Sequence, residues 1–170
     1  MAILRKNSRF LNSLLLLTFL FACSSRSHWI SDQVHSDKKE YRSAKLSYLS
    51  NDPVHGIDLE FLKIGERLNV YLNIHSIPVS PYQGKAKSAL LKLEIDGETL
   101  RYETYRLEGG QRFLLSEDVA RILIESLQNH KDVTLILPGY RSTIRPEDFS
   151  SKFNRLHDPS LLQNPFHLPM

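Results

Sequence analysis

The sequence predicts an α+β domain, built mainly from antiparallel β-strands and arranged as a small β-sandwich. Short runs of alternating apolar and polar residues recur from residue 41 to residue 115, the pattern of half-buried strands. Glycine-containing turn signals separate these runs, and tight turns join antiparallel neighbours. Residues 116–129 are the exception, because their apolar residues follow a helical period and predict one amphipathic helix.

The alternation is clearest on either side of Gly65. A weak run over 41–49 ends at Asn51-Asp52-Pro53, a stronger run starts at Ile57, and four apolar residues follow the glycine two positions apart: Leu68, Val70, Leu72 and Ile74. Glycine at the first turn position suits a type II′ turn. The two runs around Gly65 are therefore predicted to pair as a hairpin.

A second hairpin is predicted at Asp96-Gly97, the strongest turn signal in the chain. Its return strand covers 98–107, and Gly109-Gly110 turns the chain into residues 111–115. Residues 76–85 contain two prolines and a glycine, which predict a loop. This loop is long for a hairpin connection, and because loops carry function more often than scaffold does, it is the best candidate for a contact surface.

Two helices follow the strands. Ser116 is expected to cap the first helix through its hydroxyl, Glu117 to pair with Arg121 four residues on, and Asn129 to end the helix in a left-handed conformation. A short buried strand is predicted over 133–137. Pro146 suits the first turn of a short C-terminal helix over about 146–155, and the prolines after it predict an extended tail over 157–170.

The N-terminal residues 1–22 have the order of a secretory signal. Arg5, Lys6 and Arg9 precede an apolar run that ends at Ala22. The run is shorter than the roughly 20 residues that a permanent membrane span needs. We therefore expect a signal peptide that is cleaved and takes no part in the fold.

Leu20-Phe21-Ala22-Cys23 resembles the lipobox of bacterial lipoproteins, and the resemblance covers residues 1–24. It implies cleavage between Ala22 and Cys23 and lipidation of Cys23 with a diacylglyceryl group and further acyl chains such as palmitate. Several acyl chains make a stable membrane anchor where one does not. Ser24, in place of an aspartate, implies the periplasmic face of the outer membrane in a Gram-negative cell envelope. An ordinary signal peptide with an incidental cysteine is the alternative.

The mature chain is expected to be one domain on a tether. Removing residues 1–22 leaves 148 of the 170 residues, enough for one domain with a core. Residues 23–39 are predicted to be a polar, lipid-anchored tether, and residues 40–156 the globular domain. Trp29 and Ile30 interrupt the tether's polarity, and either lie at the membrane interface or begin a first strand, which we favour because an exposed tryptophan is costly.

The charge pattern argues against nucleic acid as a partner. The 22 Lys and Arg residues outnumber the 19 Asp and Glu residues, but three of the basic residues precede Cys23 and no acid does. The mature chain therefore carries 19 charges of each sign. A nucleic-acid-binding domain has a clustered basic footprint in its folded part.

No pattern assigns a catalytic residue, cofactor or metal site. The chain lacks a Gly-x-Ser-x-Gly elbow, Cys23 is expected to be acylated, and no two of the seven histidines have helical metal-ligand spacing. Two carboxylate pairs, Asp58 with Glu60 and Glu94 with Asp96, each share one strand face, which is expected to be solvated.

The expected function is a non-enzymatic binding or scaffold lipoprotein with an envelope protein as its partner. Tyrosines are common at the centres of interfaces, so a contact surface is predicted at Tyr82, Tyr102 and Tyr105, although strand tyrosines also pack across strands. Two alternatives remain open: an envelope hydrolase or transferase acting on peptidoglycan or lipid, and a lipid-carrying module with an apolar cavity between sheet and helix.

Overall fold

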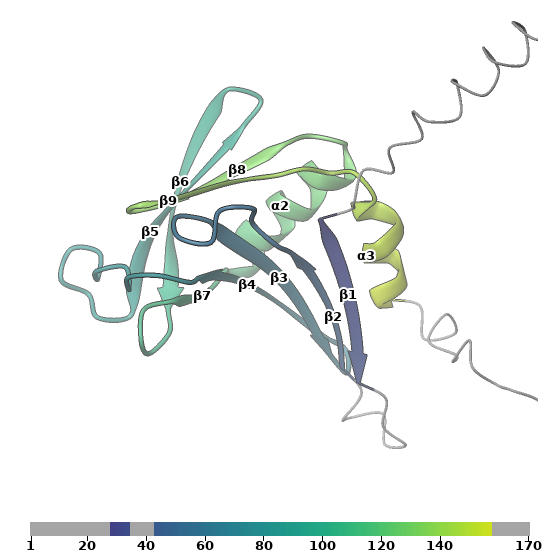
Figure 1. The fold of residues 1–170 in the computed structure, drawn as a ribbon, viewed down its shortest axis with the longest axis horizontal. Helices are drawn as coiled ribbons and strands as arrows, with labels where there is room; N and C mark the ends of the chain where they lie inside the picture. The colour runs from purple at the N-terminus through teal and green to yellow at the C-terminus, as the bar shows by residue number, and fades with distance from the viewer. Residues whose placement is uncertain (1–27, 35–42, 158–170) are drawn as a thin grey trace, which may run out of the picture.

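The structure, a computed structural model, describes residues 28–34 and 43–157 (Figure 1). These residues form one nine-stranded sheet in the order β1-β2-β3-β4-β7-β6-β5-β8-β9, in which neighbours are antiparallel. The strands are β1 (Trp29–Val34), β2 (Ser43–Tyr48), β3 (Ile57–Ile64), β4 (Arg67–Ile74), β5 (Ser88–Ile95), β6 (Glu98–Arg106), β7 (Arg112–Leu114), β8 (Val133–Leu137) and β9 (Tyr140–Ile144). The helices are α2 (Glu117–Gln128) and α3 (Phe149–His157). The predicted α+β, mainly antiparallel fold is confirmed.

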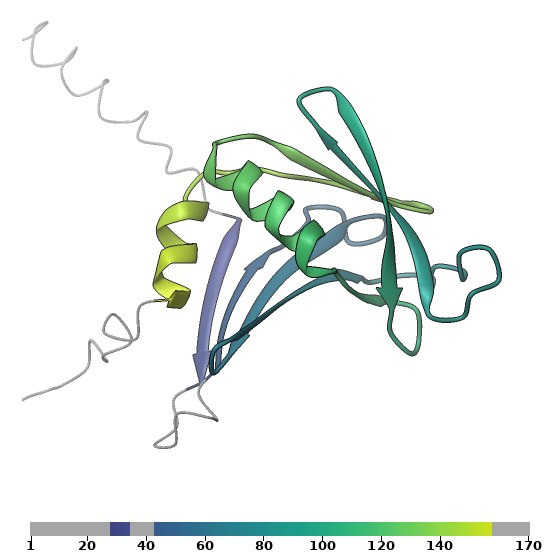
Figure 2. The same ribbon diagram turned by 180° about the vertical axis from the view of Figure 1, so that it is seen from behind.

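The sheet is curved so strongly that its two halves face each other. Figures 1 and 2 show β1 to β4 in one layer, β8 and β9 in the other, α2 between them and α3 beside β1. The short strand β7 joins the halves, pairing with β4 over Tyr71 to Asn73 and with β6 at Tyr105 and Arg106. The arrangement is therefore sandwich-like, although one continuous sheet makes both layers.

The two edge strands of the sheet come together. The indole Nε1 of Trp29 on β1 donates a hydrogen bond to the carbonyl of Arg145, just after β9. The outer edge of β9 meets the β2–β3 connection, where the amide of Arg141 donates to His55 O at 3.0 Å and the amide of Ile57 donates to Ser142 Oγ at 2.6 Å. The free backbone groups of β9 are therefore partly satisfied by the chain itself.

Aromatic rings fill the space between the sheet and α3. The centroid of Trp29 lies 4.9 Å from that of Phe149, and Phe149 lies 5.0 Å from Phe153 and 5.5 Å from Phe61. All four side chains are buried. Leu123 and Leu127 of α2 belong to the same core. The space between the sheet and the helices is therefore filled by packed side chains. Each fully buried side chain stabilises the fold by about 1.5–3 kcal/mol.

The two predicted hairpin turns are confirmed by the positive φ values of their glycines. Asp96 and Gly97 have φ values of 52° and 84°, and positive φ at both central residues is the requirement of a type I′ hairpin. Gly65 has a φ of 57° between β3 and β4, as the predicted hairpin needs. Residues 75–87 form the predicted loop between β4 and β5.

The ends of α2 differ from the prediction in detail. Ser116 is the N-cap, but its hydroxyl makes no capping hydrogen bond, and the acidic residues of the first turn are left to favour the positive end of the helix dipole. Arg121 pairs with Asp118 at 3.3 Å and Glu125 at 3.6 Å, not with Glu117. His130, not Asn129, is left-handed, with a φ of 58°. The amide of Lys131 then donates to Ser126 O, which is a Schellman motif.

The C-terminal helix also begins later than predicted. Asp148 has a φ of 65°, which no helical residue adopts, so Pro146 lies in a turn before α3, not in its first turn. The amide of Phe149 donates to Pro146 O across that turn. Phe149 and Phe153 lie on one face of α3, as predicted, and both are buried.

The predicted tether contains the first strand. All six residues of β1 pair with β2, and Trp29 is 2% exposed, so the favoured interpretation of a first strand at Trp29 is confirmed. The signal peptide, Cys23, residues 35–42 and the tail after His157 lie outside the described residues. In the part of the chain that the structure describes, no helix has the length and apolarity to cross a bilayer.

Candidate functional site

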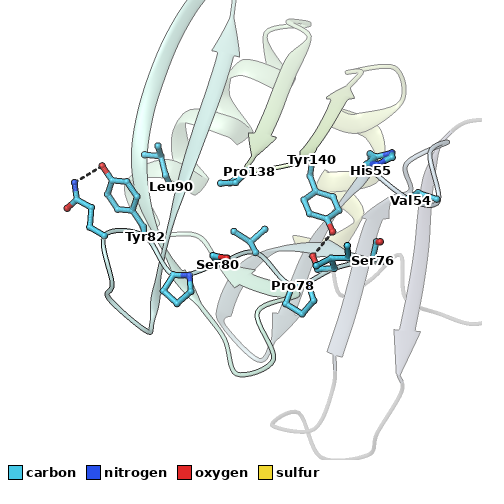
Figure 3. Close-up of a pocket in the computed structure, with 14 residues that line it drawn as sticks. Val54, His55, Ser76, Pro78, Ser80, Tyr82, Leu90, Pro138 and Tyr140 are labelled. Carbon is cyan, nitrogen blue, oxygen red and sulfur yellow. Dashed lines mark hydrogen bonds between the residues drawn. The ribbon is translucent and has the colours of Figure 1, made fainter.

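A pocket of about 550 Å³ lies where three connections between strands meet (Figure 3). The β4–β5 loop forms one wall, and the β2–β3 connection and the β8–β9 turn form the others. Its lining comprises Val54, His55, residues 76–83, Leu90, Pro138, Gly139 and Tyr140. Ligand pockets commonly have volumes of ~300–1,000 Å³, so the space suits a small ligand or a side chain of a partner.

The β4–β5 loop is held in place by hydrogen bonds at several points. Val79 is buried, its amide donates to Gly110 O at 3.0 Å, and its carbonyl accepts from Nε of Arg106 at 2.8 Å. Nη1 of Arg106 also donates to Ala86 O at 3.2 Å, and Gln111 Nε2 donates to Ser76 O at 2.6 Å. The loop is therefore shaped before any ligand binds.

Arg106 reaches the loop because residue 110 has no side chain. A Cβ on Gly110 would lie 2.1 Å from Nη2 of Arg106, and Gly110 has a φ of 68°. Among the described residues, no carboxylate forms a salt bridge with Arg106. Its guanidinium instead donates hydrogen bonds to the carbonyls of Val79 and Ala86. Arg106 is thus the side chain that positions one wall of the pocket.

Two tyrosines shape opposite walls of the pocket. Tyr140, at the start of β9, is buried, and its hydroxyl donates to the carbonyl of Ile77 across the pocket (Figure 3). Tyr82 accepts a hydrogen bond from Gln83 Nε2 at 3.1 Å, and its amide donates to Ser88 O at 2.8 Å. The Tyr140 hydroxyl therefore ties the start of β9 to the β4–β5 loop.

No Lys, Arg, Asp or Glu side chain lines the pocket. A carboxylate supports the turn that holds His55: Asp52 Oδ1 accepts the amides of Val54 at 2.8 Å and His55 at 2.9 Å. The amides of His55 and Val54 hold the pKa of Asp52 below its usual value of 3.8. The lining thus suits an uncharged, largely apolar group, because a buried charge would lack a partner.

The carboxylate pairs predicted on β3 and β5 do not act together. Each carboxylate has its own partner: Asp58 lies 2.6 Å from His75 Nε2, Glu60 pairs with Arg112 and Glu94 with Arg141 at 2.6 Å, and Asp96 pairs with Lys131 at 2.7 Å. Asp58 is buried, contrary to the expected solvated face, and its Oδ1 also accepts the amide of Ser50, which satisfies this buried carboxylate. Two of these pairs reach across an intervening strand: Glu60 on β3 meets Arg112 on β7 across β4, and Glu94 on β5 meets Arg141 on β9 across β8.

The Asp58–His75 pair lies outside the pocket lining and lacks the third member of a nucleophilic triad. Ser50 Oγ is 3.2 Å from Ser142 Oγ, and within residues 28–34 and 43–157 no serine hydroxyl hydrogen-bonds to His75. The same residues contain no group of three or more His, Cys, Asp and Glu side chains placed to hold a metal ion.

The structure separates the three tyrosines of the predicted contact surface. Tyr82 lines the pocket, within the loop that the sequence singled out. Tyr102 and Tyr105 lie on opposite faces of β6: Tyr102 pairs with Leu91 and packs against the core, whereas Tyr105 pairs with Leu114 and is exposed. Cys23 and Ala22, the predicted lipidation and cleavage sites, lie outside the described residues.

Sequence reasoning missed the pocket residues that come from other connections, which are Val54, His55, Leu90, Pro138 and Tyr140. The only local signals there are the turns at 51–53 and 138–139. No family model, curated protein or solved structure matches this chain.

Proposed function

We propose that this protein is a lipid-anchored lipoprotein of the bacterial cell envelope that acts as a non-catalytic binding or scaffold module. Its site is the pocket between the β4–β5 loop and the β8–β9 turn, and the group that it binds is an uncharged, largely apolar part of an envelope partner. The observation that carries the proposal is a preformed pocket without a Lys, Arg, Asp or Glu side chain in its lining.

The fixed shape of the loop favours binding. Immobilising a flexible loop costs about 0.5–1.5 kcal/mol for each ordered side chain, and the hydrogen bonds from Arg106 and Gln111 have already ordered this one. Pro78 and Pro81 restrict the backbone further. A partner therefore gains most of its contact energy without the cost of ordering the site.

The exposed apolar side chains around the pocket also favour binding. Ile77 is 75% exposed and Val54 is 48% exposed, and both line the pocket. Interfaces are centred on apolar and aromatic side chains that fill pockets on a partner. Ile77 is therefore the expected anchor residue of the contact.

The location follows from the lipobox-like segment. Acylation of Cys23 by more than one chain would anchor the protein stably, and Ser24 favours the periplasmic face of the outer membrane. The domain would then present its pocket to other components of the envelope.

A photo-crosslinking amino acid at Gln83, which is exposed and lines the pocket, tests the binding function in living cells. We expect discrete adducts from position 83 and none from Glu98, an exposed control in the β5–β6 hairpin. Filling the pocket with Ser80→Trp should abolish the adducts at 83. Equal adducts from both positions, or adducts that survive Ser80→Trp, would contradict a specific pocket.

A further inference from the structure

Strand β6 has an open edge along most of its length. On one side it pairs with β5 over residues 98–105, but on the other side it pairs with β7 only at Tyr105 and Arg106. After Leu114 the chain leaves the sheet and enters α2. Both ribbon views show the turn end of the β5–β6 hairpin projecting from the sheet (Figures 1 and 2). Among the residues that the structure describes, no strand therefore pairs with the second side of residues 98–104.

Three residues of this edge turn their backbone groups outward. In a two-residue hairpin the residues that flank the turn exchange both backbone hydrogen bonds, and such pairs alternate with open pairs along the ladder. Asp96-Gly97 is a turn of this kind, so the even-numbered residues of β6 bond to β5. The odd-numbered residues Thr99, Arg101 and Glu103 therefore present their N–H and C=O groups to the open side. In the described part of the chain, no backbone hydrogen bond satisfies them.

Two cations lie directly opposite each other on the outer face of the β5–β6 hairpin. Lys92 pairs with Arg101, and this is a non-hydrogen-bonded pair, in which the side chains are closest. Like charges directly opposite each other are destabilising. Among the described residues neither cation has a salt bridge, and the acids on the same face, Glu94 and Glu103, pair with other cations. An anionic group beside Arg101 would offset this repulsion.

We propose that the open edge of β6 binds an extended segment of a partner protein as an additional β-strand. The segment carries an acidic residue opposite Arg101 with an apolar residue on each side. Because side chains alternate along a strand, the acid shares the outer face with Arg101 and Lys92, and its apolar neighbours lie beside Leu100 and Tyr102, which pack against the core. In strand addition, backbone hydrogen bonds give affinity and alternate side chains give specificity. None of residues 98–104 lines the pocket, so this is a second surface.

A second copy of the chain fits this edge less well. Two antiparallel β6 strands centred on Arg101 would place the two arginines opposite each other, beside Lys92. The register that pairs Arg101 with Glu103 of the other copy would place its Thr99 opposite Tyr105, where β7 already lies. The edge therefore favours a strand of different sequence.

Two synthetic peptides test the proposal on the full chain, solubilised in detergent. The probe is Thr-Val-Thr-Val-Glu-Val-Thr, and the control peptide has lysine in place of glutamate. Amide hydrogen exchange is measured by NMR. We expect the glutamate peptide to slow exchange at Thr99, Arg101 and Glu103. The lysine peptide should bind about tenfold more weakly, since it replaces an opposite-charge pair with a like-charge pair. Arg101→Glu should reverse the preference.

Arg101→Pro separates strand addition from attraction between charges. Proline removes an outward N–H but no hydrogen bond to β5, so the thermal midpoint should change little while protection at 99 and 103 is lost. Equal protection by both peptides, protection only outside residues 98–104, or no protection by either would overturn the proposal. Slow exchange at 99, 101 and 103 without peptide would also overturn it. Such protection would assign the edge to a second copy if it depends on protein concentration, and to this chain's own residues if it does not.

Discussion

The indole Nε1 of Trp29 donates a 3.0 Å hydrogen bond to the carbonyl of Arg145 and so joins the first strand of the sheet to the residue just after the last strand. The chain continues from Arg145 into α3. There, Lys152 Nζ donates a hydrogen bond back to Trp29 O at 2.6 Å. Residue 29 is therefore the point at which both edges of the curved sheet and α3 are tied together.

Replacing Trp29 should open this closure in two measurable steps. Trp29→Phe keeps an aromatic ring but leaves the Arg145 carbonyl without its donor, and we expect a loss of about 1–3 kcal/mol in the free energy of unfolding. Trp29→Ala also removes ring contacts with Phe149, and we expect a loss of about 3–5 kcal/mol. Urea denaturation measures both values. A Trp29→Phe protein as stable as the parent would show that the hydrogen bond does not stabilise the closure.

Arg106→Lys should loosen the wall of the pocket. Lysine cannot supply the two donors, Nε and Nη1, that hold Val79 O and Ala86 O, so we expect a loss of about 1–3 kcal/mol and faster amide exchange in residues 76–87. Arg101→Lys is the control, because Arg101 is an exposed arginine on the same strand. Equal exchange rates in both variants would mean that Arg106 does not order the loop.

Gly109→Ala and Gly110→Ala should differ although both glycines have positive φ. The left-handed conformation costs alanine about 1–2 kcal/mol at either position. Only at Gly110 does the added Cβ meet Arg106, whereas nothing lies within 4 Å at Gly109. We expect Gly110→Ala to be the less stable variant in thermal denaturation. In an Arg106→Ala background the difference should vanish, and a difference that persists there would assign the cost to another contact.

Acid should loosen the Asp52 turn that supports His55. The amides of His55 and Val54 hold the pKa of Asp52 below 3.8, so the stabilisation is present above that pH and is lost as the pH falls through the lower folded-state pKa. The amide shifts of Val54 and His55 in NMR spectra should titrate with a midpoint below 3.8. Asp52→Asn should remove this titration. A midpoint at or above 3.8 would contradict the two hydrogen bonds.

The hairpins were predictable because their chemistry is local. Gly65, Asp96 and Gly97 have positive φ, and glycine and aspartate are residue types that favour this conformation in hairpin turns. The periodicity of α2 likewise places Leu123 and Leu127 in the core. The details at its ends were not predictable, because Arg121 has three acids within one turn and the choice of Asp118 and Glu125 over Glu117 involves small energy differences.

The pocket was only half predictable. The loop over 76–85 was recognisable from its prolines, and Tyr82 does line the space. Its opposite walls depend on the order of strands, in which β5 pairs with β8 and the curved sheet brings His55 to Arg141. Neither pairing leaves a signal in the sequence, since strands of equal pattern can pair in many orders. Tyr102 and Tyr105 were grouped by residue type, but side chains alternate along a strand, so two residues of β6 that are three positions apart lie on opposite faces.

Lipid attachment at Cys23 is tested most directly by the intact mass of the protein recovered from membranes of bacteria that express the full chain. The expected mass is that of a chain beginning at Cys23 and carrying a diacylglyceryl group with further acylation, and Cys23→Ala should abolish it. A chain that keeps residues 1–22, or one that begins elsewhere with Cys23 unmodified or absent, would contradict the lipid anchor.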